Sequence, residues 1–104
     1  MNNEGNVKAL VEAARGSLQA GNIQQALKEA TQAVAADSKH PPALFLLGVA
    51  LRRNGSLDEA IQRLSEFLLL APSVVQGRHE LALALSSRGQ LSAAAVELQK
   101  AVDM

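Results

Sequence analysis

The chain has 104 residues, of which 48% are hydrophobic, and its ten basic and ten acidic side chains give a formal net charge of +0. This length supports one domain with a packed core, and the balanced charge excludes the broad basic field of a nucleic-acid-binding protein. Aromatic residues make up 2% of the chain and cysteine is absent, which excludes base-stacking platforms, disulfides, thiolate metal sites and cysteine nucleophiles.

The first six residues are polar and predict a short disordered lead-in over residues 1–6. A secretory signal needs a basic segment followed by an apolar stretch, and this N-terminus has neither. The longest uninterrupted apolar run is far shorter than the roughly 20 residues that cross a membrane. We therefore expect a cytoplasmic protein with no membrane partner.

After the lead-in, the chain predicts a first pair of helices over residues 7–20 and 23–36, with a turn at Gly21. Glycine readily adopts the left-handed backbone that ends a helix. The residues of the first helix that we expect to face its neighbour are Leu10, Ala13 and Ala14.

A second pair of helices begins at Pro41. Apolar residues at Leu44, Leu47 and Leu51 recur at spacings of three and four, as in a helix that buries one side. Gly48 lies within this stripe and predicts a close helix crossing, because a side chain there would hold the neighbouring helix away.

Gly55 predicts the turn of this second hairpin. Ser56 then opens the next helix, and Glu59 three residues later predicts a capping box. Pro72 ends that helix. Its apolar stripe consists of Ala60, Ile61, Leu64, Phe67 and Leu68.

A third pair of helices is predicted over residues 75–87 and from residue 91 onward, with a turn at Gly89. Because all connections are short, neighbouring helices must pack antiparallel.

The three hairpins repeat with a period of thirty-four residues. Columns with this spacing are Gly21, Gly55, Gly89; Ala26, Ala60, Ala94; and Ile23, Leu57, Leu91. Two helices per thirty-four residues is the arithmetic of a helical solenoid. We assign its units to residues 7–40, 41–74 and 75–104.

In these columns the chain resembles the tetratricopeptide repeat. The middle unit carries the family pattern at Leu44, Leu47, Gly48, Leu51, Gly55, Ala60, Leu64, Phe67 and Pro72. The outer units depart from it at Ser17 (usually tyrosine), Ser38 (usually proline) and Arg78 (usually apolar). The resemblance covers nearly the whole chain and implies an all-α fold, a right-handed αα-hairpin solenoid of six antiparallel helices.

The third unit lacks the capping helix that usually closes such a stack. The last unit of a solenoid has an apolar face that a neighbour would normally cover. Two explanations stay open: the sequence is a piece of a longer protein, or another copy covers this face.

No set of side chains predicts catalysis, a metal site or a cofactor. His40 and His79 lie in different units with no ligand cluster beside them. Asp58 and Glu59 begin a helix, where its dipole favours carboxylates. There is no Gly-rich phosphate loop. We therefore expect a non-catalytic chain.

Helix 41–53 is apolar nearly all round, because Phe45, Leu46 and Val49 add to its core stripe. Either the superhelix covers these three side chains internally or they form a binding surface. In the tetratricopeptide family the first helix of each unit lines a groove for a peptide or helix. The resemblance implies a groove made by Val11, Arg15, Phe45, Leu46, Val49, Arg52, Arg53, His79 and Leu83.

Basic side chains outnumber acidic ones on this face. The basic set is Lys8, Arg15, Arg52 and Arg53, and the acidic set is Glu12 and Glu80. This balance favours a partner segment with apolar anchors and acidic residues. Arg52 and Arg53 also fit simple helix-end cations, so both interpretations stay open.

One subtype of the family grips the C-terminal carboxylate of chaperone tails with Lys, Asn and Arg side chains. The matching positions here are Val11, Arg15, Leu46, Gln76 and Glu80. None has the required residue, and the carboxylate of Glu80 would repel such a ligand. We predict that this chain does not belong to that subtype.

The predicted function is a protein–protein interaction module, acting as a scaffold or adaptor. Two alternatives remain. The chain could be the N-terminal module of a longer enzyme such as a transferase, or a self-assembling element whose last helix docks on another copy.

Overall fold

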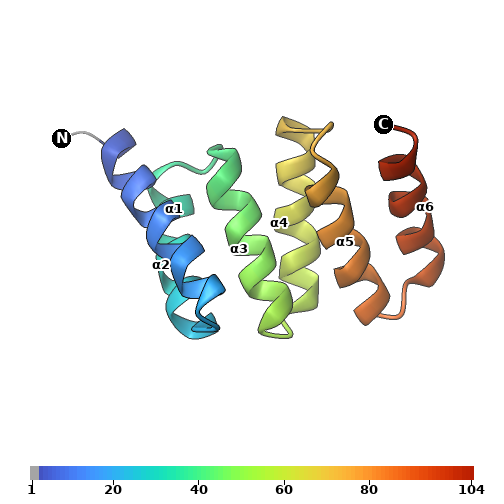
Figure 1. Cartoon of the computed structure of the whole chain (residues 1–104), viewed down its shortest axis with the longest axis horizontal. Helices are drawn as coiled ribbons and strands as arrows, with labels where there is room; N and C mark the ends of the chain where they lie inside the picture. The colour runs from blue at the N-terminus through green and yellow to red at the C-terminus, as the bar shows by residue number, and fades with distance from the viewer. Residues whose placement is uncertain (1–2) are drawn as a thin grey trace.

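The computed structural model describes residues 3–104. These residues form three helical hairpins. The six helices are α1 (Asn3–Gln19), α2 (Ile23–Ala36), α3 (Pro41–Arg53), α4 (Leu57–Leu70), α5 (Val75–Ser87) and α6 (Leu91–Val102). Each helix packs against the next, and α1 also contacts α3 as α3 contacts α5. The result is an elongated stack of 44 × 25 × 20 Å with α1–α2 and α5–α6 at opposite ends (Figure 1).

The three glycine turns close the hairpins as predicted. Gly21, Gly55 and Gly89 have φ angles of 81°, 84° and 88°. In each turn the N–H of the following residue donates to the carbonyl five residues earlier, at 2.8–2.9 Å. This bond satisfies a carbonyl that the helix end leaves unpaired, and it requires the left-handed glycine.

The predicted capping box at the start of α4 is wrong. Ser56 makes no side-chain hydrogen bond to the helix. Its hydroxyl instead accepts a hydrogen bond of 2.9 Å from the side-chain amide of Asn54. The turn itself therefore takes the hydroxyl away from the helix start.

Helix α1 begins earlier than expected. It starts at Asn3, so residues 3–6 are helical rather than a disordered lead-in, while residues 1 and 2 lie outside the described part. The buried positions of α1 are Val7, Val11, Ala14 and Leu18. Val7 belongs to the core, which explains why the first turns are part of the stack.

The predicted inner face of α1 is only partly correct. Ala14 is buried and Leu10 is half-buried, but Ala13 is exposed. The physical reason is that α2 and α3 together define the covered side of α1. Ala13 lies on the side that a preceding helix covers in the other two hairpins.

Two close helix crossings organise the stack. A Cβ added at Gly48 would lie 2.6 Å from Cγ of Leu64, which confirms the predicted close approach, here between α3 and α4. A Cβ added at Gly77 would lie 2.6 Å from Cε2 of Phe67 and 3.0 Å from Cδ2 of Leu68. The sequence analysis missed this second crossing, which joins α4 to α5.

Arg78, the departure from the apolar column, has a structural role of its own. One guanidinium nitrogen lies 3.3 Å from Glu97 on α6, and another donates to the carbonyl of Pro72 at 2.9 Å. Both charged side chains are mostly buried. The pair therefore links α5 to α6 and to the preceding loop.

Within the described residues, no helix combines the length and the apolar character needed to cross a membrane.

Candidate functional site

The first helices of the three hairpins share one face of the stack, and this face is hollowed. Three adjoining hollows have Phe45 in their lining. Phe45 lies on α3, the central helix of the face, and is half-buried. It is therefore the side chain around which the surface is arranged.

The largest hollow has a volume of about 490 Å³ and is mainly apolar. It lies where α3 begins, α4 ends and the loop into α5 passes. Its lining consists of Arg15, Pro41, Pro42, Phe45, Phe67, Ala71, Val74 and Gln76. The rings of Phe45 and Phe67 pack at 5.2 Å with an angle of 54° between them, a favourable tilted arrangement.

The two smaller hollows continue from Phe45 toward α1 and α5. One, of about 340 Å³, is lined by Arg15, Leu18, Gln19, Phe45, Leu46, Val49, Arg53 and Glu80. The other, of about 350 Å³, is lined by Phe45, Val75, Gln76, His79 and Glu80. Together the three hollows form what we call the Phe45 face.

The predicted apolar groove residues are less accessible than expected. Val11, Leu46 and Val49 are all buried. Leu46 and Val49 still form the floor of one hollow, whereas Val11 lines none of the three. Covering by the neighbouring helices therefore accounts for most of the apolar character of α3, and of the three apolar residues that α3 contributes to the predicted groove only Phe45 is not buried.

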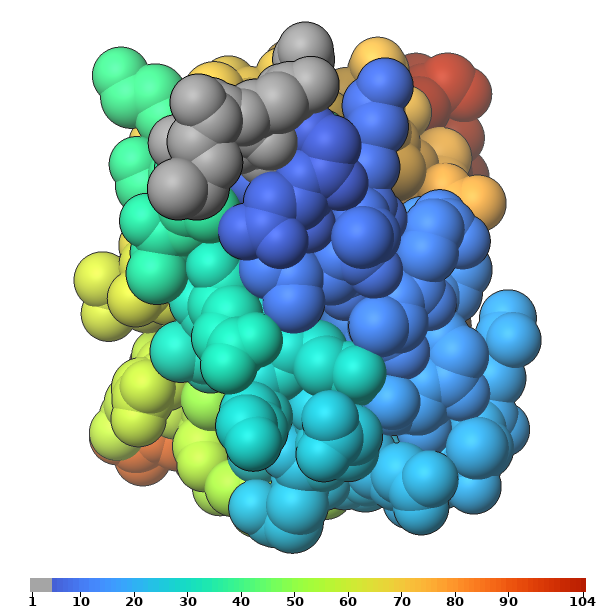
Figure 2. Space-filling view, turned by 90° about the vertical axis from the view of Figure 1, so that its left-hand side faces the viewer, coloured from blue at the N-terminus to red at the C-terminus, as the bar shows by residue number. Residues whose placement is uncertain are grey.

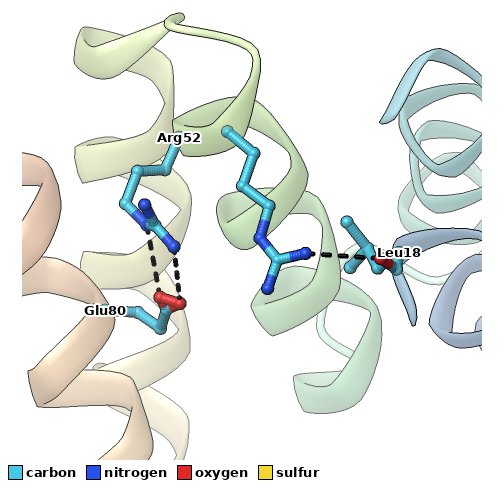
Figure 3. Close-up of polar contacts among 4 residues, drawn as sticks. Leu18, Arg52 and Glu80 are labelled. Carbon is cyan, nitrogen blue, oxygen red and sulfur yellow. Dashed lines mark hydrogen bonds and ion pairs between the residues drawn. The ribbon is translucent and has the colours of Figure 1, made fainter. Parts of the chain in front are cut away.

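Arg52 is already occupied by an ion pair. Its guanidinium donates to both carboxylate oxygens of Glu80 on α5, at 3.2 and 3.1 Å (Figure 3). The side chains are 20% and 11% exposed, so this is a two-pronged, largely desolvated pair. The expected contribution of Arg52 to an acidic partner is therefore reduced, since Glu80 neutralises it.

Arg53 turns the other way, toward α1. Its guanidinium donates to the carbonyl of Leu18 at 3.3 Å, the contact drawn at the right of Figure 3. A cation near the last carbonyls of a helix is favourable. Arg53 therefore fastens α3 to the end of α1 and also borders the Phe45 face.

The remaining predicted residues lie around the rim. Arg15 borders two of the hollows and pairs with Glu12 of the same helix. His79 borders one hollow and is exposed. Leu83 is also exposed but borders none of the three hollows.

Several lining residues were missed by the sequence analysis. They are Pro41, Pro42, Phe67, Ala71 and Val74. The available signal was that the chain has two aromatic residues, and both meet here. Phe67 was assigned only to the core stripe of its own helix.

No group of three or more His, Asp or Glu side chains in residues 3–104 is arranged to hold a metal ion. The lining of the Phe45 face is mainly apolar, and cationic, anionic and amide side chains border it.

A stack of αα-hairpins whose first helices form a hollowed face is the architecture of a helical-repeat interaction scaffold. Residues 11–73, more than half of the chain, match the family described as tetratricopeptide repeat. The chain belongs to the tetratricopeptide repeat family, whose members are typically non-catalytic interaction modules.

Several solved structures have the same fold as this chain. A MamA mutant is 26% identical, covers 94% of this chain and 72% of its own, and has a TM-score of 0.87. The second TPR of Spaghetti (RPAP3), bound to an HSP90 peptide, is 18% identical over 93% of this chain and 90% of its own, with a TM-score of 0.87. The chaperone SycD of Yersinia enterocolitica, in an alternative dimer, is 21% identical over 94% and 74%, with a TM-score of 0.86.

Coverage differs among these structures. In one crystal structure of MamA, the match spans 57% of the MamA chain. The chain also matches a Thermobaculum terrenum O-GlcNAc transferase with 20% identity and a TM-score of 0.92, over 99% of this chain but 20% of the transferase. No curated protein sequence matches the chain significantly. The likenesses at 21% identity and below establish the fold alone.

Proposed function

We propose that this chain is an adaptor that binds an extended or helical segment of a partner protein along the Phe45 face. The observation that carries the proposal is the meeting of three hollows at one half-buried aromatic side chain. In this arrangement a large apolar side chain of the partner inserts beside Phe45, above the ring of Phe67.

An apolar anchor would supply most of the affinity. Burying a leucine- or phenylalanine-sized side chain stabilises a complex by about 1.5–3 kcal/mol. Such anchors dominate binding when they enter a central, well-packed hollow surrounded by weaker contacts. The largest hollow has this character, since two prolines, two aromatic rings, an alanine and a valine make up most of its lining.

Charge would tune the binding rather than drive it. Glu80 neutralises Arg52, and Glu12 pairs with Arg15, which leaves Arg53 as the rim cation without a carboxylate partner among the described ion pairs. A rim charge affects the association rate and the salt dependence more than the affinity. We therefore expect the ligand to have an apolar anchor with an acidic residue on the side of α1.

The relatives support a peptide partner at the level of the fold. The Spaghetti domain is described as bound to an HSP90 peptide. We propose that this chain does not select a C-terminal carboxylate, because Glu80 places an anionic group where that subtype needs a basic one. A peptide with an internal anchor and an amidated end is the appropriate probe.

The test uses a displayed library of roughly 12-residue peptides with free central positions, followed by calorimetry on the selected peptides. Gln76 is exposed and lines two hollows, so Gln76→Trp would fill the site without removing a core side chain. We expect at least a tenfold loss of affinity, roughly the value of one obstructed apolar anchor.

Gln62→Trp is the matched control, because Gln62 is exposed on α4 and borders none of the three hollows. The proposal fails if the library yields no ligand. It also fails if the selected peptides bind the Gln76 and Gln62 variants equally well.

A further inference from the structure

Three apolar side chains of the last hairpin are exposed, whereas the residues at the same positions of the preceding hairpin are buried. Leu83, Leu98 and Val102 are 37%, 44% and 77% exposed. Their counterparts thirty-four residues earlier are Val49, Leu64 and Leu68, which are 5%, 0% and 8% exposed. We call the three exposed residues the tail face. It lies on α5 and α6, at one end of the stack in Figure 1.

The first hairpin exposes a set of small residues whose counterparts are covered in the other two hairpins. On α1, the exposed residues Ala9, Ala13 and Gly16 lie on one side of the helix at spacings of four and three. Their counterparts on α3 are Ala43, Leu47 and Ala50, and on α5 they are Gly77, Leu81 and Ala84; all six are buried. We call the α1 residues the head face. It belongs to the α1–α2 end of the molecule, which faces the reader in Figure 2.

The internal crossing of α4 and α5 shows how two such faces fit. There Gly77 of the later helix lies against Phe67 and Leu68 of the earlier one. The repeat period makes Ala9 the counterpart of Gly77, and Val102 the counterpart of Leu68. The tail face is therefore one half of an interface that the molecule already forms inside itself, and the head face is the other half.

We propose that the tail face binds the head face of a second copy of this chain, with α1 of that copy packing on α5 and α6 as α5 packs on α3 and α4. The counterpart of Phe67 in the tail hairpin is the small residue Ala101, so the Cβ of Ala9 would not meet the ring that a Cβ at Gly77 would meet. Leu83, Leu98 and Val102 would then become buried, as their counterparts in the middle hairpin are.

Charge does not oppose this junction. Polar pairs that cross the internal interfaces are Arg52 with Glu80 and Asp58 with Arg88. At the junction their counterparts would be Ser86 with Glu12 and Ser92 with Ala20. Neither column places like charges opposite each other, and the α2–α3 interface already has a neutral pair in one of them, Gln24 with Asn54.

The geometry also determines the kind of assembly. The two faces differ and lie at opposite ends of the 44 Å axis, so binding through them leaves a free face at each end. Such a head-to-tail contact generates an open series rather than a closed dimer. The Phe45 face takes no part, so this inference and the proposed adaptor function stand or fall separately.

The first experiment follows the mass of the full chain by light scattering and sedimentation from about 1 μM to about 1 mM, where even a weak contact is populated. We expect the average mass to rise continuously with concentration, without a plateau at the dimer. A monomer throughout the range overturns the proposal, and so does a dimer that grows no further.

Charge-blocking variants then locate the two faces. Val102→Glu blocks the tail face and Ala13→Glu blocks the head face, and both sites are exposed, so the monomer should fold normally. Each variant alone should weaken association by about 10- to 100-fold, the cost of burying an unpaired charged group at the contact. Leu69→Glu is the matched control, because Leu69 is an exposed leucine outside both faces.

Mixing distinguishes the proposed contact from every symmetric one. Val102→Glu retains a good head face and Ala13→Glu retains a good tail face, so an equimolar mixture should form a dimer and stop there. Association of the Ala13 variant as strong as that of the unchanged chain would mean that the head face takes no part in the contact, and the proposal would be wrong. Circular dichroism of each variant confirms that a lost contact is not lost folding.

Discussion

Adding one methyl group at Gly48 should have a clear effect on the free energy of unfolding. Its Cβ would lie 2.6 Å from Cγ and 2.7 Å from Cδ2 of Leu64, and Leu64 has no exposed surface. The nearest atom is the branch point of the leucine side chain, so a rotation of the chain end cannot relieve the contact. Gly48→Ala must therefore move α3 and α4 apart or displace Leu64.

The chain offers a matched control for this change. Gly16 also lies inside a helix, and a Cβ added there would have no neighbour within 4 Å. Both substitutions gain about 1 kcal/mol in helix propensity. Gly48→Ala also incurs an overpacking cost of about 1–3 kcal/mol, so its net effect lies between neutrality and a loss of about 2 kcal/mol.

The assay is urea and thermal unfolding at low micromolar concentration, where head-to-tail contacts are sparse. Gly16→Ala should raise the melting temperature, since 1 kcal/mol shifts it by roughly 4–8 °C in a domain of this size. Gly48→Ala should melt at least about 4 °C below Gly16→Ala for the same reason. If the two variants are equally stabilised, the crossing at Gly48 is not tight and the packing argument is refuted.

Two further tests concern the ion pair of Arg52 with Glu80 and the turn at Gly55. Glu80→Ala should lower the free energy of unfolding by about 1–3 kcal/mol because it leaves the partly buried Arg52 without its partner. The double change Arg52→Met with Glu80→Leu should be nearly neutral, because it removes both charges. Denaturant titrations of the single and double variants measure these free energies, and equal losses would contradict the prediction. Gly55→Ala should cost about 1–2 kcal/mol because alanine is strained at a φ of 84°, although nothing crowds its Cβ; an unchanged urea midpoint would show that the turn had relaxed to another conformation.

The fold was predictable because its signals are periodic. Three glycines at one spacing indicate three left-handed turns, and the structure has them. Gly48 was predictable for a similar reason, since glycine within an apolar helix stripe is unfavourable unless a neighbour comes close. Gly77 gave no such signal, because no continuous apolar stripe surrounds it in α5.

The start of α4 shows a limit of short motifs. A serine followed three residues later by glutamate predicts a capping box, yet the hydroxyl of Ser56 bonds Asn54 instead. The motif describes the helix alone, while the turn before it competes for the same hydroxyl. The hydrogen bond from Asn54 prevailed, and the serine–glutamate motif does not include the residue that forms it.

The candidate site was predictable only as a set of helices. The resemblance identified α3 and Phe45, but it could not separate Phe45 from Leu46 and Val49, which are both buried. Whether a side chain on the first helix is open depends on the angle and distance between hairpins. These quantities follow from side-chain volumes at crossings such as Gly77, not from the period of thirty-four.

The pairing of Arg52 with Glu80 illustrates why this distinction matters for recognition. Glu80 occupies the column of Leu46, an apolar and buried position one unit earlier, so a carboxylate there has to find a partner or remain in water. Arg52 satisfies it from α3 across a separation of twenty-eight residues, which matches neither the helix period nor the repeat. The pair removes one cation and one anion from the face at once, and the exposed chemistry that remains around Phe45 is mostly hydrocarbon. A ligand chosen by this surface would therefore be chosen first by the shape of an apolar side chain and only second by its charge.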